Sequence, residues 1–187
     1  MSYRGKVILC GEPEVGKTSL LARYVDNKFN DDYHQTIGAN FLIKEVDLSK
    51  IAGKLDIKNP KLKDDIKVKG FKLYFWDIGG QKQTMFSNEY YFVQAVGAVV
   101  IYDILRRDTF DSINYWLSKL RELSGNIPFI IVGNKVDKKH ERKVSFQEAN
   151  ELAKKYNVEY YETSAKSNEN VEEAFESLAI QILNTLK

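Results

Sequence analysis

The 187-residue sequence has little cysteine, histidine or proline, with one, two and three residues of each type. A single thiol cannot form an internal disulfide, so a small secreted domain held together by disulfides is excluded. Without a cluster of cysteine and histidine, a zinc site has no support either. Cys10 ends an apolar run, so we expect a buried structural thiol. His34 and His140 lie in polar segments and are predicted to be exposed.

The chain also lacks an excess charge of one sign and a long apolar run. Its 28 basic and 26 acidic residues leave a net charge of +2, too balanced for a nucleic-acid binder that relies on a general basic field. No apolar stretch approaches the ~20 residues of a membrane span, and residues 1–10 show no secretory pattern. With 43% apolar and 29% charged residues, we expect one domain over 1–187, cytoplasmic and monomeric, without a nucleic-acid partner.

Apolar strands alternate with helical patterns along the chain. Near-continuous apolar strands are typical of a parallel sheet covered by helices on both faces, so an α/β fold is predicted. The strands of this kind are expected at 6–10, 71–76, 98–102 and 129–132. The run 40–46 is more alternating and favours an edge strand.

Three helices carry start signals. Ser145 and Glu148 form a capping box. Asp108 is predicted to cap a second helix, and Asn170 opens a last one. Apolar residues at helical spacing predict the inner faces. These are Phe146, Ala149, Leu152, Ala153 and Tyr156; Phe110, Ile113, Trp116, Leu117 and Leu120; and Ala174, Phe175, Leu178 and Ile182.

Residues 47–70 interrupt this alternation. They carry seven lysines and four aspartates, with Pro60 and scattered aliphatic residues that give no clean period. An extended β-hairpin or a mobile surface loop is predicted for this insert.

The segment Gly11–Thr18 matches G-x-x-x-x-G-K-[ST], a phosphate-binding loop, between a strand and a helical run. Its backbone N–H groups are predicted to surround a β-phosphate, with Gly11 and Gly16 allowing backbone geometry that a side chain would block. Lys17 would neutralise β- and γ-phosphate oxygens, and Thr18 would offer its hydroxyl to Mg²⁺. The residues predicted to bind phosphate here are Glu14, Val15, Gly16, Lys17, Thr18 and Ser19. This context disfavours an ordinary strand–helix turn.

A second motif, Asp77–Gln81, follows the strand at 71–76. Asp77 is predicted to hold Mg²⁺ through water, Gly79 to donate its N–H to a γ-phosphate, and Gln81 to orient an attacking water. Alone, the motif is weak, because aspartate and glycine are common at strand ends. Together with a phosphate loop it gains specificity.

Two further segments favour guanine as the base. Asp137, in Asn134–Asp137, would accept hydrogen bonds from the guanine N1–H and amino group, which adenine cannot supply. The stem of Lys135 would lie over the base. After another short strand, Ser164, Ala165 and Lys166 would complete the site, with the Ala165 N–H facing the guanine O6.

These motifs, in this order and spacing, resemble those of the Ras-like small GTPases over nearly the whole chain except 47–70. Residues 36–41 and 89–91 look most like the Rab branch, whereas 76–81 look more like the Arf branch. The resemblance implies a P-loop GTPase fold with a six-stranded, mostly parallel sheet and five helices. It also implies GTP/GDP and Mg²⁺ as cofactors, with Gln81 and Lys17 as the catalytic residues.

Further roles follow only from the resemblance. Phe29 would pack on the guanine edge, Tyr33 would cover the phosphates, and Thr36 would be a second protein ligand to Mg²⁺. Two switch segments, about 30–40 and 78–92, would be ordered by the γ-phosphate. Effector, exchange-factor and GTPase-activating proteins would bind through about 30–46 and 78–92.

Four features depart from the pattern. Pro13 has no N–H and would crowd an incoming catalytic arginine. Lys82 replaces an acidic residue, which puts conventional exchange-factor action in doubt. The insert at 47–70 is expected beside the first switch, either as a partner surface or only as a longer hairpin. The C-terminus has no cysteine and Ser2 replaces the glycine of a myristoylation motif, so no lipid anchor is expected in this chain, and any membrane contact would be peripheral, through a partner.

Three functions remain open from the sequence. The first is a GTPase switch with slow intrinsic turnover that a partner accelerates, because no arginine just before Thr36 offers a built-in finger. The second is a catalytically silent GTP-binding scaffold, which measurable hydrolysis that is lost on Gln81→Leu would oppose. The third is an ATP-using phosphotransferase, which competition between GTP and ATP for the site distinguishes.

Overall fold

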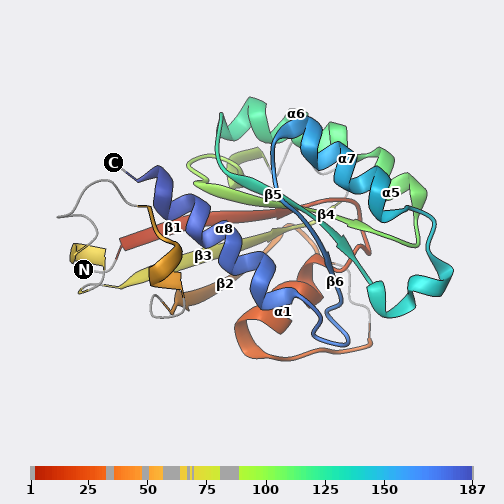
Figure 1. The fold of residues 1–187 in the computed structure, drawn as a ribbon, viewed down its shortest axis with the longest axis horizontal. Coiled ribbons are helices and arrows are strands. Elements are labelled where there is room, and N and C mark those ends of the chain that lie inside the picture. Colours follow the sequence, from red (N-terminus) through yellow and green to blue (C-terminus); the bar gives the residue numbers. More distant parts are fainter. Residues whose placement is uncertain are drawn as a thin grey trace.

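The computed structural model describes residues 3–32, 36–47, 51–56, 64–66, 68, 70–80 and 89–186 (Figure 1). The strands are β1 (Tyr3–Cys10), β2 (Ala39–Val46), β3 (Phe71–Ile78), β4 (Gly97–Asp103), β5 (Phe129–Asn134) and β6 (Tyr160–Thr163). The α-helices are α1 (Lys17–Asp26), α5 (Arg107–Asp111), α6 (Ile113–Ser124), α7 (Phe146–Tyr156) and α8 (Val171–Thr185). Short 3-10 turns are η1 (Ala52–Lys54), η3 (Glu89–Tyr91) and η4 (Val136–Glu141).

The strands form one six-stranded sheet in the order β2-β3-β1-β4-β5-β6. All neighbouring pairs are parallel except β2 and β3, which are antiparallel. The predicted fold class is confirmed, and so is the edge position of β2. In a parallel sheet the carboxyl ends of the strands meet at one edge, which is where ligands bind in folds of this type.

Helices cover both faces of the sheet, which explains the continuous apolar strands. In β1, Val7 and Leu9 pack with α1 and α8, whereas Ile8 and Cys10 pack with α6 and α7. Because successive side chains of a strand point to opposite faces, both sets must be apolar. The Cys10 thiol is fully buried, as predicted, and burial raises its pKa to about 12.

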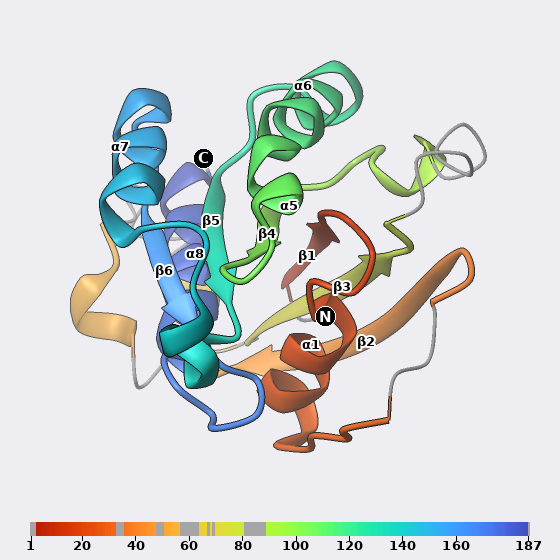
Figure 2. The ribbon, with the colours of Figure 1, turned by 90° about the vertical axis from the view of Figure 1, so that its right-hand side faces the viewer.

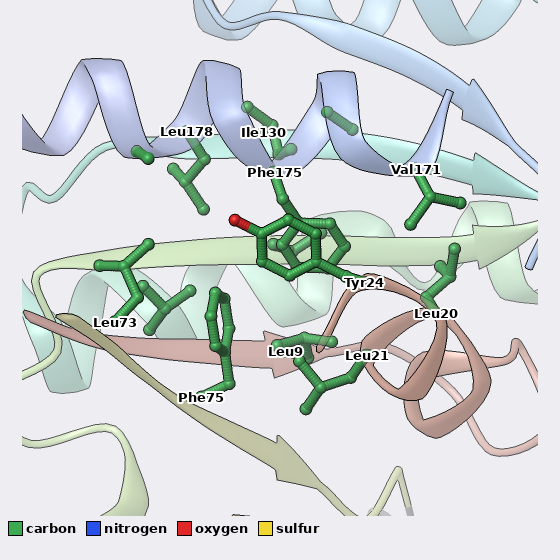
Figure 3. Close-up of a cluster of buried hydrophobic side chains, with 14 of the residues drawn as sticks. Leu9, Leu20, Leu21, Tyr24, Leu73, Phe75, Ile130, Val171, Phe175 and Leu178 are labelled. Atoms are coloured by element: carbon green, nitrogen blue, oxygen red, sulfur yellow. The ribbon is translucent and has the colours of Figure 1, made fainter. Parts of the chain in front are cut away.

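Aromatic rings fix α1 and α8 on the first face (Figure 3). Tyr24 of α1 stacks on Phe175 of α8, with ring centres 4.3 Å apart and an interplanar angle of 8°. Phe75 of β3 meets both rings edge-on, at 5.7 and 5.5 Å. Such pairs each add about 0.5–1.5 kcal/mol beyond their buried area. The last turn of α1 is thereby fixed against α8 and the sheet.

The helix predictions hold except at Asp108 and at Phe146, which belongs to the predicted inner face of α7 but is 48% exposed. The Ser145–Glu148 capping box is present, and α7 follows it. Asn170 precedes α8, whose predicted inner face is buried. Asp108, however, lies inside α5 and accepts a 2.8 Å hydrogen bond from Arg106 instead of capping a helix. The predicted single helix is divided at Ser112 into α5 and α6.

The predicted hairpin at 47–70 is wrong for the residues that the structure describes. Residues 51–54 and 64–66 have helical conformation, and Ile51 and Ile66 are 0% and 1% exposed within the core under α8. The N–H of Asp56 donates to Asn184 Oδ1 on α8 at 2.8 Å. Each of the two helical turns places one isoleucine in the core. Burial of these side chains explains why the pairing of β2 with β3 does not continue into the insert.

The expected position of this insert beside the first switch is also wrong. The β2–β3 pair runs from Ala39 opposite Ile78 at one end to Val46 opposite Phe71 at the other. The insert joins Val46 to Phe71, whereas Asp77 lies at the opposite end, near the phosphate loop. The described helical turns of the insert, 51–54 and 64–66, thus lie at the far end of the sheet from the candidate site (Figure 1). Among the described residues, no helix is long and apolar enough to cross a membrane.

We predict that Ile66 stabilises the fold while the neighbouring exposed Val68 does not. Ile66→Ala removes a buried side chain and leaves a cavity, so the free energy of unfolding should fall by about 2–5 kcal/mol. Val68 is 85% exposed, so Val68→Ala should change it by less than about 0.5 kcal/mol. Urea unfolding of the two variants measures both, and equal midpoints would show that Ile66 is not docked in the core.

Candidate functional site

A cavity of about 450 Å³ opens at the carboxyl ends of the strands. Figure 2 looks toward this edge, with the loop between β1 and α1 facing the viewer. Most of the predicted site residues line the cavity: Glu14, Gly16, Lys17, Thr18, Ser19, Phe29, Thr36, Asn134, Lys135, Asp137, Ala165 and Lys166. Residues far apart in the sequence therefore meet at one place.

The phosphate loop needs glycine at two positions because its backbone is crowded. Gly11 has φ +145°, and an added Cβ would lie 2.1 Å from the Ile101 carbonyl oxygen. Gly16 has φ +93°, and its Cβ would lie 2.3 Å from the Asn134 side-chain nitrogen. That nitrogen donates to the Val15 carbonyl at 2.9 Å. Val15 is fully buried and does not line the cavity with its side chain, so only its backbone N–H remains a candidate.

Lys17 is held inside the loop. Its ammonium donates to the carbonyl oxygens of Gly11 at 2.9 Å and Glu12 at 2.8 Å. Burial lowers the pKa of Lys17, and the nearby carboxylate of Asp77 opposes that shift. A cation that is already desolvated and aimed by two carbonyls is well prepared to meet anionic oxygens.

Thr18, Thr36 and Asp77 form a polar cluster at the start of α1. The hydroxyls of Thr18 and Thr36 are 2.9 Å apart, and the Thr18 hydroxyl donates to Asp77 Oδ2. The Thr36 hydroxyl reaches the same oxygen at 3.5 Å. Burial raises the pKa of Asp77, while Thr18 and Lys17 lower it in part. All three predicted metal ligands therefore lie together.

This cluster fits a hard divalent cation. Asp77 Oδ1 is buried and has no hydrogen-bond partner among the described residues, although an unpaired buried carboxylate oxygen is costly. Two hydroxyls and one carboxylate are oxygen donors of the kind that Mg²⁺ takes, with phosphate and water completing its octahedron. The described residues include no group of three acidic, histidine or cysteine side chains, so a cage made of protein ligands alone is not formed there.

The segments after β5 and β6 form the other end of the cavity. Lys135, with φ +73°, places its ammonium 2.7 Å from Asp103 Oδ2, a carboxylate buried under the sheet edge. Asp137 Oδ1 accepts a 2.6 Å hydrogen bond from the Ser164 hydroxyl. Ser164 is fully buried and does not line the cavity, so it supports Asp137 from behind. Among the residues that the structure describes, none is recorded as donating a hydrogen bond to the other carboxylate oxygen of Asp137.

The prediction for Gly79 is corrected by the structure. The Gly79 N–H donates to the Gly38 carbonyl at 2.8 Å, so it is occupied by the segment before β2. Gly80, its neighbour, lines the cavity, and an added Cβ there would lie 2.5 Å from the backbone of Glu12 and Pro13. Gly80 is therefore the better candidate for a phosphate-binding amide. Tyr33, His34, Gln81 and Lys82 lie outside the described residues.

Supporting residues that sequence reasoning missed surround the site. Asp103 fixes Lys135, Arg106 donates to the Pro13 carbonyl at 3.1 Å, and Arg23 donates to the Ala165 carbonyl at 2.8 Å. None belongs to a recognisable motif. The one available signal was the position of Asp103 at the end of an apolar strand, as Asp77 is.

Comparisons with known proteins agree with this geometry. The family model described as "Ras family" matches residues 6–184. Ras-related protein Rab-21 of Bos taurus is 39% identical over 185 residues, covering 98% of this chain and 75% of its own length. The Rab-21 of Homo sapiens is 38% identical, and Ras-related protein Rab-13 of Bos taurus is 36% identical over 179 residues, which cover 95% of this chain and 79% of its own.

Members of this family are GTPases that act as molecular switches, and they bind GTP and GDP through a loop of the kind formed here by Gly11–Thr18. The relatives named above are Rab proteins, in agreement with the Rab-like residues 36–41 and 89–91. With a family match over nearly its full length and the matching fold, this chain belongs to the Ras family of small GTPases and is Rab-like.

Proposed function

We propose that this GTPase is a Mg²⁺-dependent switch in trafficking or signalling whose first switch segment senses the bound nucleotide through Thr36. One observation carries the proposal: the Thr36 hydroxyl, from the segment before β2, lies 2.9 Å from the Thr18 hydroxyl of the phosphate loop. A cation on Thr18 and Asp77 would thus reach a residue of the partner-binding segment directly. The segment would be held while a γ-phosphate and the cation are present, and released after hydrolysis.

The phosphates would lie over the Gly11–Thr18 loop. Its N–H groups and the N-terminus of α1 give positive potential at the cavity floor. Lys17 would contact β- and γ-phosphate oxygens, and the Gly80 N–H would reach the γ-phosphate. Mg²⁺ would be held by Thr18 and Thr36, with Asp77 acting through water, and when bound it supplies neutralisation of phosphate charge.

Guanine would fill the end of the cavity between Phe29 and Asp137. The free oxygen of Asp137 would accept from N1–H and the exocyclic amino group, and the Ala165 N–H would face O6. Lys135, held by Asp103, would lay its stem over the ring. The alternative ATP-using phosphotransferase would leave the Asp137 carboxylate without these donors.

Hydrolysis would need few protein groups. Lys17 and the backbone donors stabilise charge on the transferred phosphoryl group, and Gln81 would orient the attacking water. We propose slow intrinsic turnover that a GTPase-activating protein accelerates, because no arginine precedes Thr36. Pro13 lines the cavity beside the place that such an arginine would take.

Partners would bind the β2–β3 face next to Thr36. Ile37 is 90% exposed, and Phe41 and Ile43 on β2 are each more than two-fifths exposed. Phe41 packs on Trp76 with ring centres 4.9 Å apart, and Trp76 in turn lies 5.4 Å from Tyr91. Exposed aromatic groups of this kind are frequent anchors of protein interfaces. We propose that effectors and regulators bind here and that the protein is a cytoplasmic monomer.

The first prediction concerns the base. Fluorescent GDP on the protein should be displaced by GTP and not by ATP. Asp137→Asn replaces a carboxylate, which only accepts hydrogen bonds, with an amide that both donates and accepts. The affinity for GDP should therefore fall roughly tenfold to a hundredfold. The affinity for xanthosine diphosphate, which has a carbonyl in place of the amino group, should rise. Asp111→Asn, at an exposed ion pair with Arg107, is the matched control. Equal competition by ATP would overturn the choice of guanine.

A second prediction concerns Mg²⁺. Chelation of Mg²⁺ should speed GDP release from the wild-type protein by tenfold or more. A factor of ten corresponds to a loss of about 1.4 kcal/mol in the free energy that holds GDP. In Asp77→Ala the release should already be fast and respond little to the chelator, whereas Asp111→Asn should behave as the wild type. Stopped-flow fluorescence gives both rates. If Asp77→Ala keeps the full response to chelation, the cation does not lie at this cluster.

A third prediction concerns the attacking water. Gln81→Leu removes the amide that would orient it, so single-turnover hydrolysis should slow by roughly tenfold to a hundredfold, with GDP affinity unchanged. Measuring phosphate release together with GDP binding separates the two effects. Turnover at the wild-type rate would mean that another group positions the water. Wild-type protein without turnover would favour the scaffold alternative.

A further inference from the structure

Arg23, on the last turn of α1, is the hydrogen-bonding centre of the base end of the cavity. Its Nε donates to the Ala165 carbonyl at 2.8 Å and its Nη2 to the Lys166 carbonyl at 3.3 Å. Its Nη1 donates to both the backbone and the side-chain oxygen of Asn27 at 3.0 Å. One guanidinium thus ties the loop after β6 to the end of α1. A planar fork of donors suits this task, and lysine could not replace it.

The guanidinium of Arg23 also lies next to Phe29, on the opposite wall of the cavity. Its carbon is 5.9 Å from the ring centre of Phe29, a cation–π distance. Asn27 ends α1 with φ +54°, which turns the chain back so that Phe29 reaches the cavity. Phe29, Ala165 and Lys166 all line the cavity, whereas Arg23 does not. Arg23 therefore contacts both walls without occupying the space of a ligand.

The contact to Ala165 also fixes a backbone direction. The C=O and N–H of a trans peptide point in opposite directions. With the Ala165 carbonyl held on Arg23, the N–H of that same peptide unit, which belongs to Lys166, points away from Arg23. The Lys166 carbonyl is held in the same way, and the N–H of its peptide unit, which belongs to Ser167, donates to the Ser164 hydroxyl oxygen at 3.0 Å. The Lys166 N–H is thereby aimed before any ligand binds, which suits a carbonyl oxygen on the base.

We infer that Arg23 is a positioning residue for guanine, which sets the separation of Phe29 from the 165–166 loop and aims the Lys166 N–H of that loop at the base carbonyl O6. The inference rests on the proposed function, since it takes guanine as the base in this cavity. Arg23 acts through Ala165 and Lys166 and touches no reacting atom.

The test compares three diphosphates on the wild-type protein and Arg23→Ala. GDP has O6, the N1–H and the amino group, inosine diphosphate lacks only the amino group, and 2-aminopurine riboside diphosphate lacks O6 and the N1–H, of which the N1–H contact belongs to Asp137. Arg23→Ala should weaken GDP about tenfold, or about 1.4 kcal/mol. Its preference for GDP over the analogue without O6 should shrink, whereas its preference for GDP over inosine diphosphate, set by Asp137, should stay. Displacement of fluorescent GDP gives all the affinities.

Two variants complete the design. Arg121→Ala removes an exposed arginine that lies 5.3 Å over Tyr156, away from the cavity, and should change no affinity. Arg23→Lys keeps the charge without the fork and should restore GDP affinity only in part. An equal loss for all three diphosphates, or full restoration by lysine, would overturn the inference and leave the proposed function intact. Failure of the wild-type protein to bind GDP would instead overturn both.

Discussion

The site depends on one constraint: the carbonyl groups of the phosphate loop must be bound by side-chain donors so that its N–H groups stay open to an anion. Four carbonyl oxygens of the loop accept side-chain hydrogen bonds, those of Gly11 and Glu12 from Lys17, of Pro13 from Arg106, and of Val15 from Asn134. These donors come from α1, the segment before α5, and β5. The fold is therefore needed to hold eight residues in a conformation that they would not keep alone.

Opposite charges buried beside this loop link the proposed cation site to the segment before β2. Lys17 and Asp77 are 6% and 0% exposed, and burial disfavours the charged form of each. Leaving either one unpaired would be costly, which makes the pair sensitive to any charge that arrives. Thr36 contacts Asp77 Oδ2 and the Thr18 hydroxyl, so the segment before β2 depends on the same balance.

The sequence predicted the features whose signal is local. The apolar period of β1 follows from its two covered faces, and the Ser145–Glu148 capping box begins α7 as expected. The loop motif identified most of the cavity because its geometry rests on glycines that no other residue can replace. Thr36 depended on family resemblance, since a threonine in a loop has no signal of its own.

The features that could not be predicted from the sequence depend on contacts between residues far apart in the chain. Arg23 contacts a loop 142 residues away, and nothing in its neighbours predicts that contact. Two adjacent glycines, Gly79 and Gly80, do not indicate which N–H faces the cavity; pairing with Gly38 decides it. In the insert, lysines obscured the two isoleucines that enter the core, so neither the hairpin nor the surface loop that the sequence left open included the burial of their apolar area.

The edge strand β2 joins these two ends of the molecule. Its pairing with β3 continues through eight residue pairs, from Ala39 beside the site to Val46 beside the insert. Near the insert its edge carries Glu45, which is paired with Lys72 at 3.4 Å, and such charges discourage association of sheet edges. Near the site it carries Phe41, which is exposed. The exposed apolar side chains of β2, Phe41 and Ile43, thus lie between Glu45 and the end next to Thr36, which is where the proposed nucleotide-dependent binding of a partner would take place.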